Sequence, residues 1–173
     1  EHLWIAFYVL CLQLFVALPI QVLLYPYYKS WGMSTSLEKP SLFTTLGHVA
    51  FFILVEEVGF YYSHRAIHAR PFYSLIHRIH HTYSAPVAHA SEYAHTIEFV
   101  LSNLLPVLLG ALFIGAHVFE LYFWISIAIF STLNGHSGYY FDFLPFADSR
   151  NHDFHHSKYM NNYGAIGLLD WLH

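Results

Sequence analysis

Residues 99–141 read FVLSNLLPVLLGALFIGAHVFELYFWISIAIFSTLNGHSGYYF, and this stretch decides the fold that we predict. It carries one charged residue, Glu120. A single membrane crossing needs about 20 apolar residues, so the stretch is long enough for two helices. We therefore expect a membrane hairpin at about residues 97–134 that turns near residues 115–119. Because two crossings return the chain to the face that it left, the segments before and after the hairpin share one side of the membrane.

Two further apolar stretches precede the hairpin. Residues 3–24 contain no charged side chain, and Pro19 is a position where we expect a kink. Residues 42–62 are apolar apart from a few polar positions, of which Glu56 and Glu57 are the costliest in hydrocarbon. These two carboxylates must therefore face the protein interior or a polar cavity.

The predicted fold class is an all-α integral membrane protein with about four transmembrane helices. We divide the chain into residues 1–41, the first transmembrane helix and its connection, and residues 42–173, a domain that carries the hairpin. The composition agrees, since 56% of residues are hydrophobic and 10% are charged, far from the averages of soluble proteins. Because the chain opens at Glu1 and stops at His173, we also expect it to be a portion of a longer protein.

Charge and cysteine content exclude several classes of function. Seven Lys and Arg residues stand against eleven Asp and Glu residues, and no basic run could neutralise a row of phosphates, so we expect no nucleic acid partner. The single cysteine, Cys11, allows neither a disulfide framework nor a cysteine-based zinc site. Histidine is the unusual residue, with fifteen copies.

The histidine-rich segments are expected on the cytosolic side. The basic residues that flank them are Arg65, Arg70, Arg78, Arg150 and Lys158. Only Lys29 and Lys39 lie near the connection between the first two spans. Cytosolic segments of membrane proteins carry an excess of Lys and Arg, so this difference predicts that the histidines lie in the cytosol.

Three short motifs hold eight of the histidines. They are His64-x3-His68, His77-x2-His80-His81 and His152-x2-His155-His156. A pair of histidines three or four residues apart lies on one face of a helix and can present two nitrogens to one metal ion. An adjacent histidine is turned by about 100° and can face a second ion. The first motif continues out of the second span, in a helix that we expect Pro71 to end.

The metal is not fixed by these residue types, because imidazole binds zinc, copper, iron and nickel. The H-E-x-x-H pattern of zinc proteases is absent. Eight histidines exceed the needs of one ion, and two ions at the edge of a lipid-filled cavity suit oxygen chemistry on an apolar substrate. Isolated histidines such as His2, His48, His117 and His173 are expected to be structural. A metal transporter, a haem-binding membrane protein and a scaffold with a structural metal remain as alternatives.

The three motifs resemble the histidine boxes of the fatty acid hydroxylase and sterol desaturase superfamily. The boxes lie at residues 64–68, 77–81 and 152–156, and the short gap between the first two is similar to that superfamily and unlike acyl-CoA desaturases. Other motifs resemble the methylsterol monooxygenase branch and the fatty acid hydroxylase domain-containing proteins beside it: Tyr61-Tyr62-Ser63-His64-Arg65, Ala85-Pro86, Glu92-Tyr93-Ala94-His95, Gly135-His136-Ser137-Gly138-Tyr139 and Asn162-Tyr163-Gly164. The resemblance covers about residues 50–173.

This resemblance implies a helical membrane domain in the endoplasmic reticulum with a cytosolic metal cap that holds two non-haem iron ions. It also implies O2 as co-substrate and electrons from NAD(P)H through cytochrome b5 and its reductase. Carried over residue by residue, the metal ligands are the eight box histidines together with His95 and His136, namely His64, His68, His77, His80, His81, His95, His136, His152, His155 and His156. From the residues alone, we expect some of the carboxylates Glu57, Glu92, Asp142 and Asp153 to accept hydrogen bonds from the ligand rings.

The function that we predict is hydroxylation of a membrane lipid, in particular a sterol at a C4 methyl group. The alternative within the same class is a fatty-acyl or sphingolipid hydroxylase or desaturase. A metal transporter would place its ligands along a path through the membrane. The clusters instead gather at the ends of the predicted spans, which favours a catalytic cap.

Overall fold

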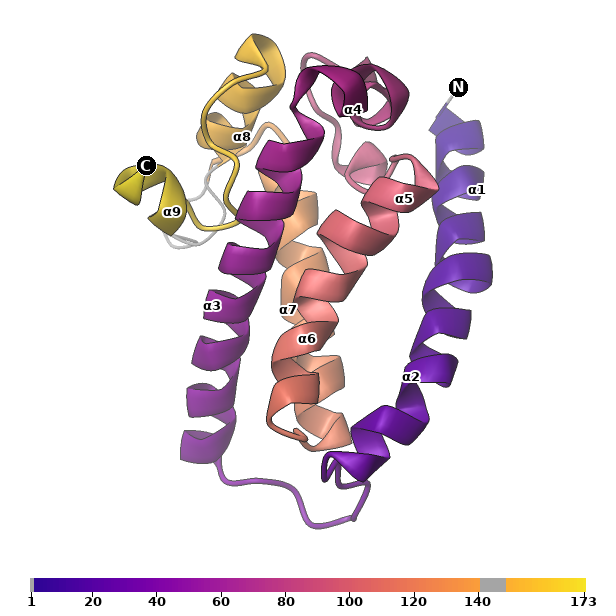
Figure 1. Ribbon diagram of the computed structural model, residues 1–173, viewed down its shortest axis with the longest axis vertical. Coiled ribbons are helices and arrows are strands. Elements are labelled where there is room, and N and C mark those ends of the chain that lie inside the picture. The colour runs from indigo at the N-terminus through magenta and orange to yellow at the C-terminus, as the bar shows by residue number, and fades with distance from the viewer. Residues whose placement is uncertain (1, 141–148) are drawn as a thin grey trace.

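We describe residues 2–140 and 149–173 of a computed structural model, in which these residues form helices and no strands. Four long helical segments make up most of the described residues. They run side by side between the two ends of the molecule (Figure 1). In chain order they are α1 (His2–Leu12), the π-helical turn η1 (Gln13–Ala17) and α2 (Leu18–Ser30); then α3 (Leu42–Ile67); then α5 (Thr96–Glu98), the π-helical turn η4 (Phe99–Leu104) and α6 (Leu105–Phe113); and finally α7 (Val118–Gly135).

Each of the four segments is long and apolar enough to cross a membrane. Large apolar side chains remain on their outer surfaces, where Leu3 is 88% exposed and Phe43 is 86% exposed. Such a large exposed apolar surface is unfavourable in water and is expected against lipid. Helices tolerate lipid because their backbone hydrogen bonds are satisfied internally. The structure therefore confirms an all-helical membrane fold with four spans.

Two of the spans contain a widened π-helical turn, and a proline follows each turn. Pro19 comes two residues after the end of η1, and Pro106 comes two residues after the end of η4. Proline has no N–H to donate and its ring crowds the carbonyl four residues earlier, so the preceding turn widens. In place of the kink expected at Pro19, the helix thus contains a π-helical turn just before the proline.

The hairpin turns at residues 114–117, between α6 and α7. His117 caps α7, because its Nδ1 accepts the Phe119 N–H at 3.0 Å, and the Glu120 carboxylate accepts the His117 N–H at 3.0 Å. The other oxygen of Glu120 lies 3.0 Å from His48 Nδ1 on α3. The charged residue of the hairpin is therefore fully buried and ties the turn to a neighbouring span.

The core of the bundle lies between α3, α6 and α7. Phe52, Leu108 and Trp124 are nearly inaccessible there. Tyr28 on α2 donates a hydrogen bond to the Leu108 carbonyl at 3.0 Å, which links the first span to this core. Trp124 donates to the Val107 carbonyl at 2.9 Å. The polar atoms of these large side chains are thus satisfied inside the bundle.

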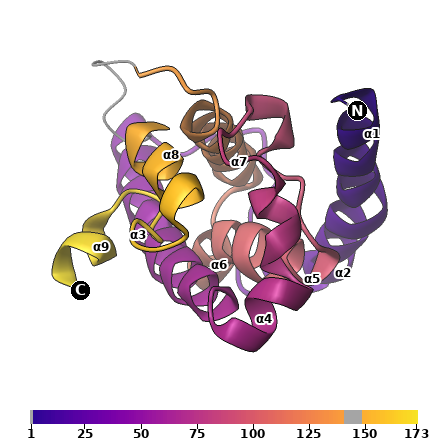
Figure 2. The same ribbon diagram turned by 90° about the horizontal axis from the view of Figure 1, so that it is seen from above.

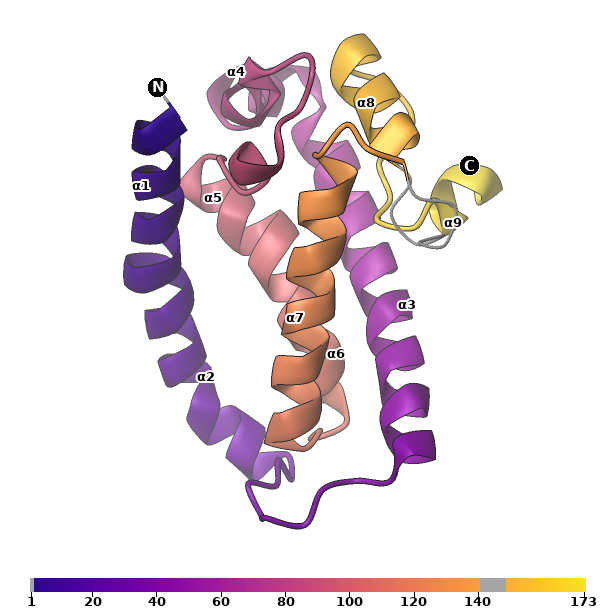
Figure 3. The same ribbon diagram turned by 180° about the vertical axis from the view of Figure 1, so that it is seen from behind.

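The first histidine motif lies at the end of α3, the second in η2 and the third in α8. Several short helices gather at this end of the bundle, as Figures 2 and 3 show. These are α4 (Arg70–Leu75), the 3-10 helices η2 (His77–Thr82) and η3 (Ala88–Ala90), α8 (Ser149–Lys158) and α9 (Leu168–Leu172). Pro71 does not end α3, which stops at Ile67; it lies in the first turn of α4, where its missing N–H costs nothing. The prediction that Pro71 ends the helix of the first histidine motif was therefore wrong, because that helix ends before Pro71 and the proline belongs to the next one.

Candidate metal centre

Nine histidines form two adjacent groups in the described part of the chain. The five-histidine group is His64, His68, His77, His81 and His155, and the four-histidine group is His80, His136, His152 and His156. Within each group, one ring nitrogen from every member lies within 4.8 Å of those of the other members. Most of the rings are buried. Each group is therefore compact enough to surround a single metal ion.

Both double-histidine motifs contribute to both groups. His81 belongs to the five-histidine group and its neighbour His80 to the other. His155 and His156 are divided in the same way. Adjacent positions on a helical turn point in different directions, so each pair can serve two ions. This division agrees with the spacing argument for more than one metal.

Backbone carbonyls fix the orientation of several rings. The Nδ1 atoms of His64, His136, His155 and His156 donate to the carbonyls of Tyr163, Thr132, Asn161 and Tyr83, at 2.9, 2.8, 2.7 and 3.0 Å respectively. A carbonyl only accepts, so the proton of each neutral ring is on Nδ1. The opposite nitrogen, Nε2, is left with a lone pair that can bind a metal.

His77 is oriented by a carboxylate instead. Its Nδ1 donates to Glu98 Oε1 at 2.8 Å, and both residues are almost completely buried. Glu98 lies on α5, at the start of the third span. A carboxylate that accepts a ring N–H makes the ring a stronger ligand.

The donor atoms fit a cation. His64 Nε2 and His77 Nε2 lie 3.1 Å apart, and because both rings are protonated on Nδ1, two lone pairs face each other. Without a positive charge between them this contact is repulsive. Two nitrogens at about 2.1 Å from one ion and at a right angle would lie about 3.0 Å apart. His156 Nε2 is also buried without a hydrogen bond partner.

The same spacing occurs at other pairs of Nε2 atoms. In the five-histidine group it is 2.9 Å between His77 and His81 and 3.1 Å between His68 and His155. In the four-histidine group His136 Nε2 is 2.8 Å from that of His152 and 3.3 Å from that of His80. Both groups thus have the nitrogen spacing of neighbouring ligands on one ion.

Burial keeps these rings neutral. It lowers the pKa of His68 and of His156 to about 3, that of His136 to about 4 and that of His81 to about 2, with nearby histidines adding to the effect. Burial also lowers the pKa of His77, His80, His152 and His155. Protons therefore do not compete for the nitrogens at neutral pH.

The sequence model of the family described as Fatty acid hydroxylase matches residues 49–173. The chain belongs to this fatty acid hydroxylase family. It is 43% identical over 161 residues to a fatty acid hydroxylase domain-containing protein 2 of Homo sapiens, covering 93% of this chain and 48% of that protein. It is 40% identical over 168 residues to a methylsterol monooxygenase of Aspergillus fumigatus, covering 91% of this chain and 57% of that protein.

The chain is also 35% identical over 167 residues to a very-long-chain aldehyde decarbonylase of Oryza sativa, covering 91% of this chain and 62% of that protein. The chain thus spans about half the length of the first relatives and somewhat more of the others. No solved structure matches it. The predicted superfamily is therefore confirmed by sequence, and its members act on several lipids according to their names.

One ligand predicted for this fatty acid hydroxylase domain is placed elsewhere. His95 belongs to neither histidine group in the described residues. Its Nδ1 accepts the Ile97 N–H at 3.2 Å and so caps α5. The geometry thus assigns His95 to the start of the helix that carries Glu98, and it does not support the ligand role that the resemblance implied. His136, the other additional histidine, does lie in a group.

Two of the carboxylates proposed as acceptors for ring N–H groups, Glu57 and Glu92, have other partners. Glu57 accepts the backbone N–H groups of Ile166 and Leu169, both at 2.9 Å. Glu92 accepts a hydrogen bond from Gln13. Asp142 lies outside the described residues. Glu98, which does contact a ring, was missed because it directly precedes the apolar run that begins at Phe99; its place at the membrane end of a span, close to His95, is the signal that could have revealed it.

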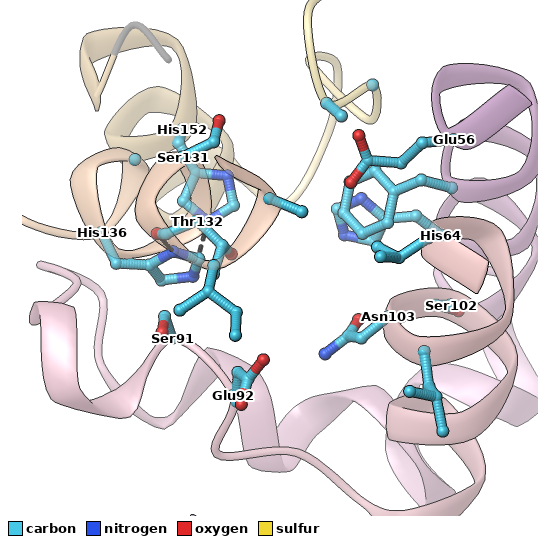
Figure 4. A pocket seen from close by; sticks show the side chains of 18 of the residues that line it. Glu56, His64, Ser91, Glu92, Ser102, Asn103, Ser131, Thr132, His136 and His152 are labelled. Carbon is cyan, nitrogen blue, oxygen red and sulfur yellow. Dashed lines mark hydrogen bonds between the residues drawn. The ribbon is translucent and has the colours of Figure 1, made fainter. Parts of the chain in front are cut away.

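A cavity of about 320 Å³ leads from the histidines into the membrane helices. His64, His77, His80, His136 and His152 line one part of it, and apolar residues of α3, α6 and α7 line another. Figure 4 shows His64, His136 and His152 at this cavity. In this fatty acid hydroxylase domain, both histidine groups are therefore reached from a space that lies within the apolar bundle.

Proposed function

We propose that this chain is the membrane domain of a non-haem di-iron oxygenase that uses O2 to hydroxylate a sterol at a C4 methyl group. The observation that carries the proposal is the pair of adjacent histidine groups at the end of a cavity within the spans. The similarity to a methylsterol monooxygenase supports the choice of substrate. Because the chain covers about half of the first relatives, the activity of the whole protein belongs to this proposal.

A second candidate is hydroxylation of a fatty-acyl or sphingolipid chain, or its desaturation. It is favoured by a relative named a fatty acid hydroxylase in Mycosarcoma maydis, which is 39% identical over 150 residues. The two candidates share the histidine groups and differ in the lipid that fills the cavity. Analysis of the products separates them.

The chain's own residues would act by holding and orienting. The five and four histidines supply neutral nitrogen ligands for two ions, while Glu98 and four carbonyls fix the ring protons on the outward nitrogens. Bound iron would supply the activation of O2 that attack on an unactivated C–H bond requires. Apolar cavity walls keep water away and hold the lipid beside the histidines.

We further propose that electrons come from NAD(P)H through cytochrome b5 and its reductase, at the cytosolic face of the endoplasmic reticulum. The basic residues of the histidine end support this orientation, since Arg65, Arg70 and Lys158 all lie in or beside the helices of that end. Metal transport fits the geometry less well. Both groups lie at one end of the bundle rather than along a path through it, and a haem would need only two axial histidines.

The test expresses the full-length protein in cells that lack their own C4-methylsterol oxidase, with the His155→Ala/His156→Ala variant and His2→Ala as a matched control. We expect 4-methylsterols to fall with the unmutated protein and with His2→Ala, and to persist with the double variant, by mass spectrometry. Purified double variant should also have lost bound iron. Hydroxylated fatty acids in place of this change would favour the second candidate, and full iron retention by the double variant would contradict the metal centre.

A further inference from the structure

The cavity contains a polar site that the metal ligands do not use. Glu56 on α3 and Asn103 on η4 line it, and Figure 4 shows both side chains pointing into the space. Ser102, the neighbour of Asn103, also lines it and is 1% exposed. All three lie within spans, at a depth where polar side chains are costly. Side chains in such a position therefore need a hydrogen-bond partner.

Within residues 2–140 and 149–173, none of the three has one. Glu56 and Asn103 make no hydrogen bond or ion pair, and the Ser102 hydroxyl is buried without a partner. The adjacent carboxylate, Glu57, is by contrast fully engaged with backbone N–H groups. An unpaired polar group in an apolar setting costs on the order of 1–3 kcal/mol. A ligand in the cavity would gain by meeting these groups.

The charges of the cavity wall select the kind of ligand. Glu56, Glu92, Glu98 and Asp170 line it, and no Lys or Arg does so among the described residues. No side chain there could neutralise the carboxylate of a free fatty acid or the phosphate of a phospholipid held beside Glu56. A plain hydrocarbon chain would leave the polar site unpaired. A neutral hydroxyl meets both conditions, because it can donate to the Glu56 carboxyl and accept from the Asn103 amide.

We infer that Glu56, assisted by Asn103 and Ser102, binds the hydroxyl group of a neutral lipid in this cavity and so determines substrate specificity. The inference rests on the proposed function, because it takes the cavity to be the substrate site. It fixes the class of lipid, a long or polycyclic alcohol. The carbon that is oxidised depends on what lies beside the histidines.

The test measures lipid binding to the purified full-length protein and does not depend on turnover. Two matched sets of probes are used: cholesterol with its methyl ether, and octadecan-1-ol with its methyl ether and with octadecanoate. Each ether keeps the hydrocarbon and loses the donated hydrogen. We expect at least one alcohol to bind about tenfold more tightly than its ether, and octadecanoate to bind more weakly than octadecan-1-ol.

The variants locate this preference. Glu56→Leu should weaken binding of that alcohol about tenfold and leave binding of its ether unchanged, which also shows that the variant is folded. Glu56→Gln keeps an acceptor oxygen and should retain most of the preference. Glu38→Leu removes an exposed carboxylate at the other end of the molecule and should bind all probes as the unmutated protein does.

Several results would overturn the inference. With the unmutated protein, these are equal binding of both alcohols and their ethers, or failure of both alcohols to bind. Binding of octadecanoate as tight as that of octadecan-1-ol would also overturn it. With Glu56→Leu, the contradicting result is an equal effect on an alcohol and its ether. Loss of oxidation or iron in the histidine variants is measured separately. A failed proposal for the reaction can therefore be told apart from a failed assignment of Glu56.

Discussion

The position of a single proton decides what each histidine can bind. His77 donates Nδ1–H to Glu98, so its Nε2 lone pair faces His64 and His81. If that proton moved to Nε2, the ring could not act as a ligand on its inner side. Glu98 is thus a positioning residue that acts through His77.

We expect Glu98→Gln to lower iron affinity by roughly tenfold to a hundredfold, which is the usual effect of losing a carboxylate behind a metal-bound histidine. The amide oxygen can still accept the ring N–H, so the fold should survive while the charge is lost. The measurement is the chelator concentration at which half of the iron leaves the purified protein. Glu92→Gln is the matched control, because Glu92 accepts a hydrogen bond from Gln13 and makes none with a histidine among the described residues. Identical midpoints for Glu98→Gln and the unmutated protein would contradict this role.

At the scale of elements, α3 joins the membrane bundle to the segment that follows the third histidine box. Glu57 is 1% exposed and accepts two backbone N–H groups from that segment, at Ile166 and Leu169. Asp170 accepts two more, from Tyr163 and Gly164. A Cβ on Gly164 would lie 2.6 Å from Glu57 Oε1, so only glycine leaves room for the carboxylate. The Tyr163 carbonyl that orients His64 is held in place by this arrangement.

We expect Glu57→Gln to destabilise the protein by on the order of 2 kcal/mol, because the amide has one acceptor oxygen and its NH2 group would face a backbone N–H. The loss should be concentrated in residues 163–170, since these depend on the carboxylate. Thermal unfolding in detergent and limited proteolysis near the C-terminal end measure the two effects. Glu38→Gln, at an exposed carboxylate, provides the comparison. Unchanged proteolysis of Glu57→Gln would show that the segment is held by other contacts.

At the scale of the whole molecule, four spans bring distant parts of the chain to one end. The five-histidine group combines residues of α3, η2 and α8, and the four-histidine group combines residues of η2 and α8 with His136 at the end of α7. The hairpin of α6 and α7 makes this possible, because it returns the chain to the end where η2 lies (Figure 1). The cavity then lies between the spans and opens on both groups.

The orientation of this bundle can be tested in sealed microsomes, whose outer face is cytosolic. In a Cys11→Ser background, Ser74→Cys on α4 should react with an impermeant thiol reagent in intact vesicles, because the histidine end carries more basic residues. Thr35→Cys, in the connection between α2 and α3, should react only after the membrane is opened. Both positions are exposed, so access to the reagent is limited by the membrane alone. The opposite pattern would place the histidines in the lumen.

The sequence by itself determined the spans, the hairpin and the histidine boxes. Hydrophobicity and residue spacing are local properties, and residues 99–141 or His152-x2-His155-His156 carry them without any knowledge of the fold. Spacing also indicated that His80 and His81 face different ions, since a helical turn separates neighbours by angle.

Only the tertiary structure decided which residues meet. His77 is paired with Glu98 across 21 residues, and His64 with the Tyr163 carbonyl across 99. It also placed His95 at a helix terminus outside both histidine groups, and it left Glu56 facing the cavity while its neighbour Glu57 is bound to backbone. Such contacts depend on how separate helices pack against each other. Packing brings together groups that are far apart along the chain, so their contact cannot be predicted from local sequence.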